Sequence, residues 1–248
     1  MDSVCKKAIS VLREADDKFY IDMIDPLEAG SVEAVEAHED GVLIHFESGL
    51  WYYMAKTAER AVQLARTFAK SKTPKEMVCA HDRVGIEQVS KELGGIWYDV
   101  PCYVAALFRK QPFEVPGELS GRLEFRKMTM AQAPIFAEHY TMIKGSPGAM
   151  DYARERLEAD AMYGGYVEGK MVGFIGMHRE DTMGMLEVFP EYRRQGYGEE
   201  LEMLLCNEII KEGRVPFCHI LENNVASLHL QKKLGLWLSD NRRVYWMG

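Results

Sequence analysis

The residues whose types and spacing point most directly to chemistry form the turn Arg193-Arg194-Gln195-Gly196-Tyr197-Gly198. The N–H groups at a helix start have no acceptor within the helix and carry the positive end of the helix dipole, so they suit a pyrophosphate. Glycines let the backbone approach phosphate oxygens, and the two arginines add positive charge. The residues alone leave two interpretations open: an anion-binding turn, or an ordinary strand-loop-helix junction with solvated arginines.

The elements on either side must position this turn. Apolar periodicity predicts a strand over 183–189 before it and a long helix over 198–212 after it. The rest of the second half is predicted to contain strands over 123–127, 165–167, 172–178, 216–221 and 243–247, and helices over 130–142, 150–162 and 225–234. This order is typical of a mixed α/β layer protein.

The first half shows a loosely similar order. It is predicted to have a helix over 3–20, which Ile24-Asp25-Pro26 either stops or follows with a turn. The predicted strands cover 32–38, 42–46, 50–54, 76–80 and 102–108, and further helices cover 58–70 and 84–93. Residues 109–121 hold two prolines and two glycines with few aliphatic residues, which is typical of a linker. We therefore expect two domains, residues 1–115 and 122–248.

The turn resembles the acyl-CoA site of the GNAT superfamily of N-acyltransferases, which is written Arg/Gln-x-x-Gly-x-Gly/Ala. Here it is Arg193-x-x-Gly196-x-Gly198, and Val-x-Pro-x-Tyr-Arg leads into it. Further on, Asn224 precedes an expected helix that ends in Lys-x-Gly, similar to the family's second conserved stretch. Residues 216–227, taken with the preceding Leu-Glu-Val-Phe-Pro-Glu-Tyr-Arg, resemble the glycine N-acyltransferase-like branch. The resemblance covers the second half firmly and the first half only vaguely.

The resemblance implies a fold and a cosubstrate. Residues 122–248 would form a mixed central sheet flanked by helices, and the N-terminal α/β domain would be a degenerate half-copy, a wall of the acceptor cleft or a dimerisation domain. Acetyl-CoA or another acyl-CoA would be bound without a metal. The implied CoA-binding residues are Val188, Phe189, Arg193, Arg194, Gln195, Gly196, Tyr197, Gly198, Glu199, Asn224 and Ser227.

The reaction that the resemblance implies is direct attack of an amine on the thioester, which needs a base and an oxyanion donor, such as the amide of Val188. Glu187 and His219 are the two candidate bases, and each has an ordinary alternative: an ion pair for Glu187 and a core histidine for His219. Gln231 stands where many relatives place a tyrosine that protonates the thiolate. Tyr245, in the final strand, is a substitute candidate for that acid.

The acceptor is expected to be the primary amine of a small molecule. Two other functions stay open: acetylation of a protein or peptide, and a CoA-binding sensor without catalysis, which the missing tyrosine at Gln231 favours. The segment Lys144–Gly148 lies where relatives carry an acceptor loop, and a plain connector is the alternative.

Composition limits the remaining classes. The 248 residues carry a net charge of −8, which argues against a nucleic-acid binder. The five cysteines include no CxxC pair, so a disulfide scaffold or zinc cluster is not expected. No apolar stretch has the length of a membrane span, and the N-terminus does not resemble a signal peptide. We expect a cytoplasmic protein without a membrane partner, with a homodimer as an open possibility.

Overall fold

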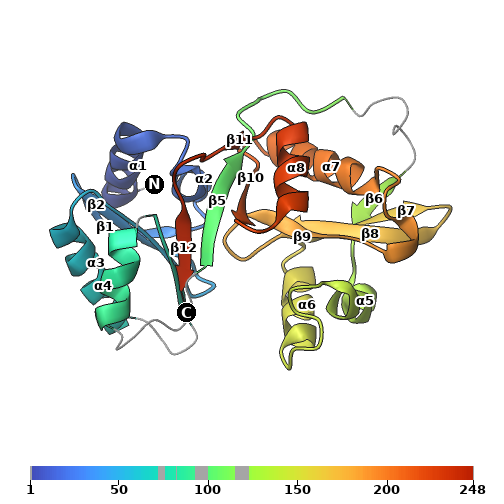
Figure 1. Ribbon diagram of the computed structural model, residues 1–248, viewed down its shortest axis with the longest axis horizontal. Coiled ribbons are helices and arrows are strands. Elements are labelled where there is room, and N and C mark those ends of the chain that lie inside the picture. The colour runs from blue at the N-terminus through green and yellow to red at the C-terminus, as the bar shows by residue number, and fades with distance from the viewer. Residues whose placement is uncertain (1, 72–75, 82, 93–99, 115–122, 248) are drawn as a thin grey trace. The chain divides into compact units, whose positions relative to one another are not determined.

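The computed structural model describes residues 2–71, 76–81, 83–92, 100–114 and 123–247 (Figure 1). The chain divides into two compact units. The first contains Met1–Leu107 and Phe217–Gly248, and the second contains Phe108–Pro216. The chain thus changes unit just before the expected linker and returns to the first unit at Phe217.

The first unit is built on an eight-stranded sheet with the order β1-β2-β3-β4-β12-β5-β10, and β11 also pairs with β5. β3 and β4 pair in parallel, and the other pairs described in this sheet are antiparallel. Its strands are β1 (Glu33–His38), β2 (Gly41–His45), β3 (Leu50–Ala55), β4 (Met77–Ala80), β5 (Val100–Ala106), β10 (Phe217–Leu221), β11 (Trp237–Leu238) and β12 (Val244–Met247).

The helices of the first unit are α1 (Ser3–Asp16), α2 (Ile21–Ala29), α3 (Ala58–Ser71), α4 (Arg83–Glu92) and α8 (Val225–Lys233). Asp2 caps α1 by accepting the Cys5 N–H at 2.7 Å. Buried Ala8 and Leu12 lie one turn apart on the apolar face of this helix. In the described ranges, no helix has both the length and the apolar character that a membrane span requires.

The second unit contains a four-stranded antiparallel sheet, β6-β7-β8-β9. Helices α5 and α6 cover one face of this sheet and α7 covers the other (Figure 1). The elements are β6 (Glu124–Lys127), the 3₁₀ helix η1 (Met130–Gln132), α5 (Ala133–His139), α6 (Ala149–Glu158), β7 (Met162–Val167), β8 (Lys170–Met177), β9 (Met183–Val188), the 3₁₀ helix η2 (Pro190–Tyr192) and α7 (Tyr197–Lys211).

Most predicted elements are present within a few residues of their expected limits. The predicted stop at Pro26 is wrong, because Pro26 lies inside α2, which continues to Ala29 and ends at Gly30 in a left-handed conformation (φ 76°). β11 was not predicted because two residues are too few for an alternating pattern. The expected helix end at Gly94-Gly95 and most of the linker lie outside the described residues.

The C-terminal segment did not follow the expected sheet. β10 pairs with β5, and β12 pairs with β4 and β5, so these strands extend the sheet of the first unit. The physical reason is that β5 is a nearly all-apolar strand that needs a neighbouring strand on each side. The strands that pair with it are far from it in the chain, so local patterns do not reveal them. Residues 122–248 as a catalytic domain, with residues 1–115 as a second domain, stay a prediction about function.

Candidate functional site

The junction between β9 and α7 has the geometry expected of an anion-binding turn. After η2, Arg193 is extended, Arg194 is left-handed (φ 60°), and Gly196, also left-handed (φ 86°), directly precedes the helix. Because Gly196 has no side chain, it cannot cap the N–H groups at the start of the helix. Because a left-handed conformation strains residues with a side chain, glycine is the residue that fits at position 196.

Two side chains of this turn form hydrogen bonds to the backbone just before it. The Arg193 Nε donates to the Val188 carbonyl at 2.9 Å, and the Gln195 Nε2 donates to the Glu191 carbonyl at 3.2 Å. Arg193 and Arg194 are both exposed. Arg193 therefore stabilises the turn through its hydrogen bond to Val188.

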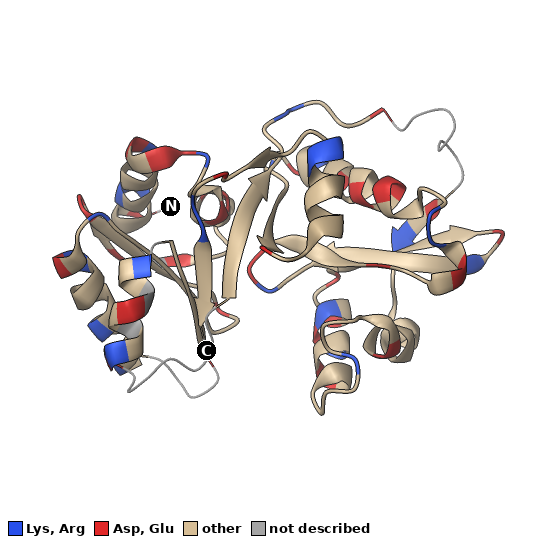
Figure 2. Cartoon of the chain, viewed as in Figure 1, with Lys and Arg blue, Asp and Glu red and all other residues tan. Residues whose placement is uncertain are grey.

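Acidic residues lie along α7 (Figure 2). Two of them, Glu199 and Glu200, are in its first turn, where negative charge offsets the helix dipole. Glu200 is buried, and its carboxylate accepts the Leu123 N–H at 3.1 Å. It thus joins the helix start to the residue that precedes β6.

A bulge shapes the end of β9. The pairing of β8 with β9 shifts register between Phe174 and Gly176, and opposite this shift Met185 has a φ of 55°. Bulges redirect the side chains that follow them and often lie next to active sites. Met185 and Phe189 both enter the core beneath α5 and α6.

Beyond the bulge, Val188 has its backbone groups at the open edge of the sheet. The Phe189 N–H donates to the Val172 carbonyl of β8 at 2.9 Å, so the backbone groups of Phe189 face β8. Successive residues of a strand direct these groups to opposite sides. The Val188 N–H therefore faces away from β8, as a donor to a ligand at this edge would.

Glu187 lies on the same face as Met185 and Phe189. It is half-buried, and its carboxylate accepts the backbone N–H of Thr141 at 2.8 Å. One oxygen thus fixes the start of the loop between α5 and α6, which contains the candidate acceptor segment Lys144–Gly148. The ion pair that was the alternative role for Glu187 does not occur among its described contacts.

His219 lies in the first unit, in a buried polar cluster. Its side chain is 6% exposed, and Trp246 Nε1 donates to its Nδ1 at 3.1 Å. The proton must then be on Nε2, which donates to Asp22 at 2.8 Å. Both ring nitrogens are occupied, which matches the core-histidine alternative and leaves no lone pair for an amine proton while these bonds persist.

A second histidine completes this cluster. His81 Nε2 lies 2.9 Å from the Asp22 carboxylate, and its Nδ1 lies 3.2 Å from the Tyr53 carbonyl. Both partners are hydrogen-bond acceptors, so hydrogen bonds hold this ring on both sides. Although burial opposes it, the two histidines hold the pKa of Asp22 well below its usual value. The two histidines thus share one buried carboxylate.

The same cluster meets the distance criterion for a metal site, because ligand atoms of Asp22, Cys79 and His219 lie within 4.8 Å of one another. The Trp246 bond argues against a metal there. It requires a proton on His219 Nε2, the nitrogen that would have to coordinate the ion. Asp22 and His81 could not be predicted from the sequence, since their partners are distant in the chain.

The other predicted residues belong to the first unit and have ordinary structural contacts there. Tyr245 packs on the core around Trp51 and Leu64. Its strand neighbour Trp246 contacts His219, and adjacent strand residues face opposite sides, so Tyr245 is not brought to His219. Asn224 caps α8 by accepting the Ser227 N–H at 3.1 Å. Gln231 is buried.

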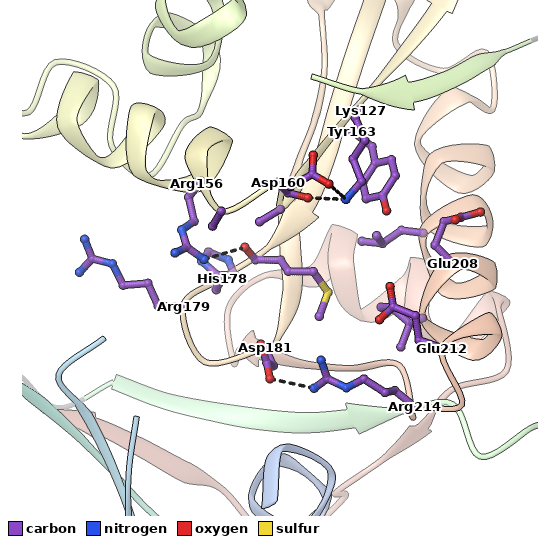
Figure 3. Close-up of a pocket in the computed structure, with 15 residues that line it drawn as sticks. Lys127, Arg156, Asp160, Tyr163, His178, Arg179, Asp181, Glu208, Glu212 and Arg214 are labelled. Carbon is purple, nitrogen blue, oxygen red and sulfur yellow. Dashed lines mark hydrogen bonds and ion pairs between the residues drawn. The ribbon is translucent and has the colours of Figure 1, made fainter. Parts of the chain in front are cut away.

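A cavity of about 330 Å³ lies elsewhere in the second unit, around the end of β8 and the C-terminal half of α7 (Figure 3). Its charged groups largely pair with one another: Lys127 with Asp160 at 3.2 Å and Arg214 with Asp181 at 2.8 Å. None of the predicted site residues lines it. It therefore has no part in the candidate site.

Comparison with known proteins gives one family match. Residues 162–247 match the model of the FR47-like protein family. This segment begins at β7 and includes β9, the turn and α7. It also includes α8 with its cap Asn224.

Solved structures match almost the whole chain. A Drosophila protein aligns over 98% of this chain and 95% of its own, with a TM-score of 0.67 and 14% identity. A GCN5-related N-acetyltransferase-like protein from Streptococcus suis covers 97% and 99%, with a TM-score of 0.54 and 12% identity. A GNAT-family acetyltransferase from Colwellia psychrerythraea covers 97% and 96%, with a TM-score of 0.53 and 12% identity.

These likenesses concern the fold, because the identities are low. They confirm the predicted fold class, a mixed sheet flanked by helices. The two-unit chain is matched as a whole rather than in its second half alone. The narrower likeness to the glycine N-acyltransferase-like branch stays a prediction.

Proposed function

Because this chain has the GNAT fold, as its sequence predicted, and a segment that matches the FR47-like family, we propose that it is an acyl-CoA-dependent N-acyltransferase. Its acceptor is the primary amine of a small molecule. The observation that carries the proposal is the junction before α7, where Gly196 precedes the helix in a left-handed conformation without a side-chain cap. Acetyl-CoA or another acyl-CoA is the cosubstrate, and no metal takes part.

The turn would hold the cosubstrate through its backbone. The amides from Arg194 to Glu199 surround the start of α7, where the helix dipole favours a pyrophosphate. Gly198 has space around it, because a Cβ there would meet the Val188 side chain at an ordinary 3.5 Å. Arg194 supplies charge, while Val188 and Phe189 meet the pantetheine arm. A contact of Asn224 and Ser227 with the cosubstrate stays a prediction from the sequence.

The second part of the site would serve the reaction. When bound, the cosubstrate supplies the acyl thioester. The Val188 N–H at the open edge of β9 donates to the developing oxyanion. Glu187 attracts the acceptor's ammonium group, because its carboxylate is half-buried and one oxygen is held by the Thr141 N–H. Glu187 also accepts a proton during the attack.

His219 and Tyr245 are weaker candidates than Glu187. The hydrogen bonds of His219 to Asp22 and Trp246 would have to break before it accepted a proton. Tyr245 packs on the apolar core around Trp51. The thiolate is therefore proposed to leave without a tyrosine acid. A cytoplasmic location and a homodimer stay predictions.

Turnover of acetyl-CoA tests the proposal, with thiol release followed against a panel of small primary amines and basic peptides. Release that depends on a small amine is expected. Thiol release with peptides alone would indicate that the acceptor is a protein or peptide instead of a small amine. Binding of CoA without thiol release for any acceptor would favour the sensor function, and failure to bind CoA would contradict the cosubstrate.

A further inference from the structure

We propose that His139 is a second proton-handling residue of the acyltransferase site and takes the first proton from the acceptor's ammonium group. The inference rests on the proposed function. The sequence did not mark this residue, because a histidine near a helix end has many ordinary roles. Its position in the structure distinguishes it from the other histidines.

The first observation is where the ring is held. His139 is the last residue of α5, and its ring lies on that of Phe189, with centroids 4.4 Å apart and planes inclined by 36°. Phe189 is buried in the core beneath α5 and α6, so the stack fixes the imidazole. Phe189 directly follows Val188, the proposed oxyanion donor.

The second observation is how close this position is to Glu187. Residues two apart in an extended chain lie roughly 7 Å apart on the same side. Glu187 therefore lies next to the Phe189 ring on the face that His139 covers. Two residues after His139, the Thr141 N–H binds the Glu187 carboxylate at 2.8 Å. The end of α5 and the start of the following loop thus contact the end of β9 twice, at Phe189 and at Glu187.

The third observation is that the ring nitrogens are available. Within the described part of the chain, neither nitrogen of His139 has a hydrogen-bond partner, and the residue is half-buried. By contrast, both nitrogens of His219 and of His81 are occupied. His139 combines a fixed ring, access to solvent and an open nitrogen beside the proposed reacting atoms.

These features divide the two protons of the reaction. The ammonium transfers one proton to an open ring nitrogen of His139, which later releases it to solvent. The neutral amine nitrogen then forms a bond with the thioester carbonyl carbon. The C–S bond breaks, and the second proton passes through Glu187 to the departing sulfur. The products are an amide, the CoA thiol and one proton, so atoms and charge balance.

Two variants test the assignment in the full-length protein. His139→Phe keeps a ring on Phe189 but transfers no proton, and we expect kcat to fall about 100-fold with the KM for acetyl-CoA within about twofold. His139→Ala opens the position, and added imidazole should restore kcat by about tenfold. His38→Phe, a histidine of β1 in the first unit, is the matched control and should behave like the wild type.

The outcomes separate the two levels of the proposal. Wild-type turnover with an unchanged kcat in His139→Phe would overturn the role of His139 alone. Failure of imidazole to rescue His139→Ala while both variants stay folded and bind acetyl-CoA would also overturn it. Absence of wild-type turnover with any acceptor would overturn the proposed function and this inference with it.

Discussion

The two units differ at one strand-to-helix junction each, in how the N–H groups at the helix start find hydrogen-bond acceptors. In the first unit, β3 leads into α3 through Lys56 and Thr57, and the Thr57 hydroxyl accepts the Arg60 N–H at 3.1 Å. In the second unit, β9 leads into α7 through a longer turn with two left-handed residues, and its N-cap residue is Gly196, which has no side chain to cap the helix. The N-cap side chain thus caps the helix at the first junction and cannot do so at the second, where we propose that a ligand binds.

The histidines show the same contrast. The side chains of His81 and His219 in the first unit are buried and fully hydrogen-bonded around Asp22, while the half-buried His139 in the second unit is held by its ring contact with Phe189. Complete hydrogen bonding stabilises a fold but leaves nothing for a substrate. The difference is consistent with our proposal that the reacting groups lie in the second unit.

The largest expected effect is on the stability of the first unit. Asp22→Asn removes the buried carboxylate that His81 and His219 share, and we expect a loss of about 3 kcal/mol or more in the free energy of unfolding. Chemical denaturation measures it, with exposed Asp17→Asn as the control. A loss below about 1 kcal/mol would contradict the structural role of this cluster.

Acid should act on the same group. The pKa of Asp22 is lowered in the folded state, so its contribution is present above the unfolded value and is lost as the pH falls. We expect stability to decline below about pH 4, the region of an unfolded aspartate. In Asp22→Asn this part of the decline should disappear, and an unchanged acid profile would show that other carboxyl groups dominate.

The next effect concerns the second unit. Glu187→Gln keeps an oxygen that accepts the Thr141 N–H but removes the charge and the base, and we expect kcat to fall about 100-fold. Binding of CoA to the turn should be unchanged, as titration calorimetry can check. Glu191→Gln, an exposed change near the turn, is the control. Equal activity of the Glu187 variant and the control would exclude Glu187 from the reaction.

A smaller effect is expected at the turn. Gly196→Ala forces a side chain into a left-handed conformation that costs about 1–2 kcal/mol, and we expect CoA to bind about tenfold more weakly. Gly213 follows α7 at its other end with a φ of 78° and open space around it. Gly213→Ala should lose similar stability and keep full affinity for CoA. Equal affinities in the two variants would contradict the proposed role of the turn.

The smallest effect is at the closed junction. Thr57→Ala should cost about 1 kcal/mol of stability through the lost helix cap, with no effect on CoA affinity. Thr57→Ser keeps the hydroxyl and should be nearly neutral. If Thr57→Ala weakened CoA binding, the first junction would also belong to the ligand site, and the contrast between the units would fail.

The sequence predicted local features well. The turn before α7 is encoded by residues adjacent in the chain, so its glycines and the strand and helix around it were visible as a pattern. The strand-turn-strand alternation of β7 and β8 was equally local. Likewise, Asn224 was recognised at the start of α8, where it acts as a cap.

Long-range partners were not predictable in the same way. The role of His219 depends on Asp22 and Trp246, which no sequence spacing connects to it, so a candidate base proved to be a core histidine. His139 was missed for the converse reason, since its ring contact with Phe189 arises only when α5 packs on β9. The return of β10 and β12 to the first unit also follows from strand pairing across the whole chain.

Amide hydrogen exchange with and without CoA tests the central claim most directly, because it compares the two junctions in one experiment. We predict that CoA slows exchange across Arg193–Glu199 and leaves Lys56–Arg60 unchanged. Unchanged exchange at Arg193–Glu199 under saturating CoA, or equal protection at both junctions, would contradict the assignment of the site to the second unit.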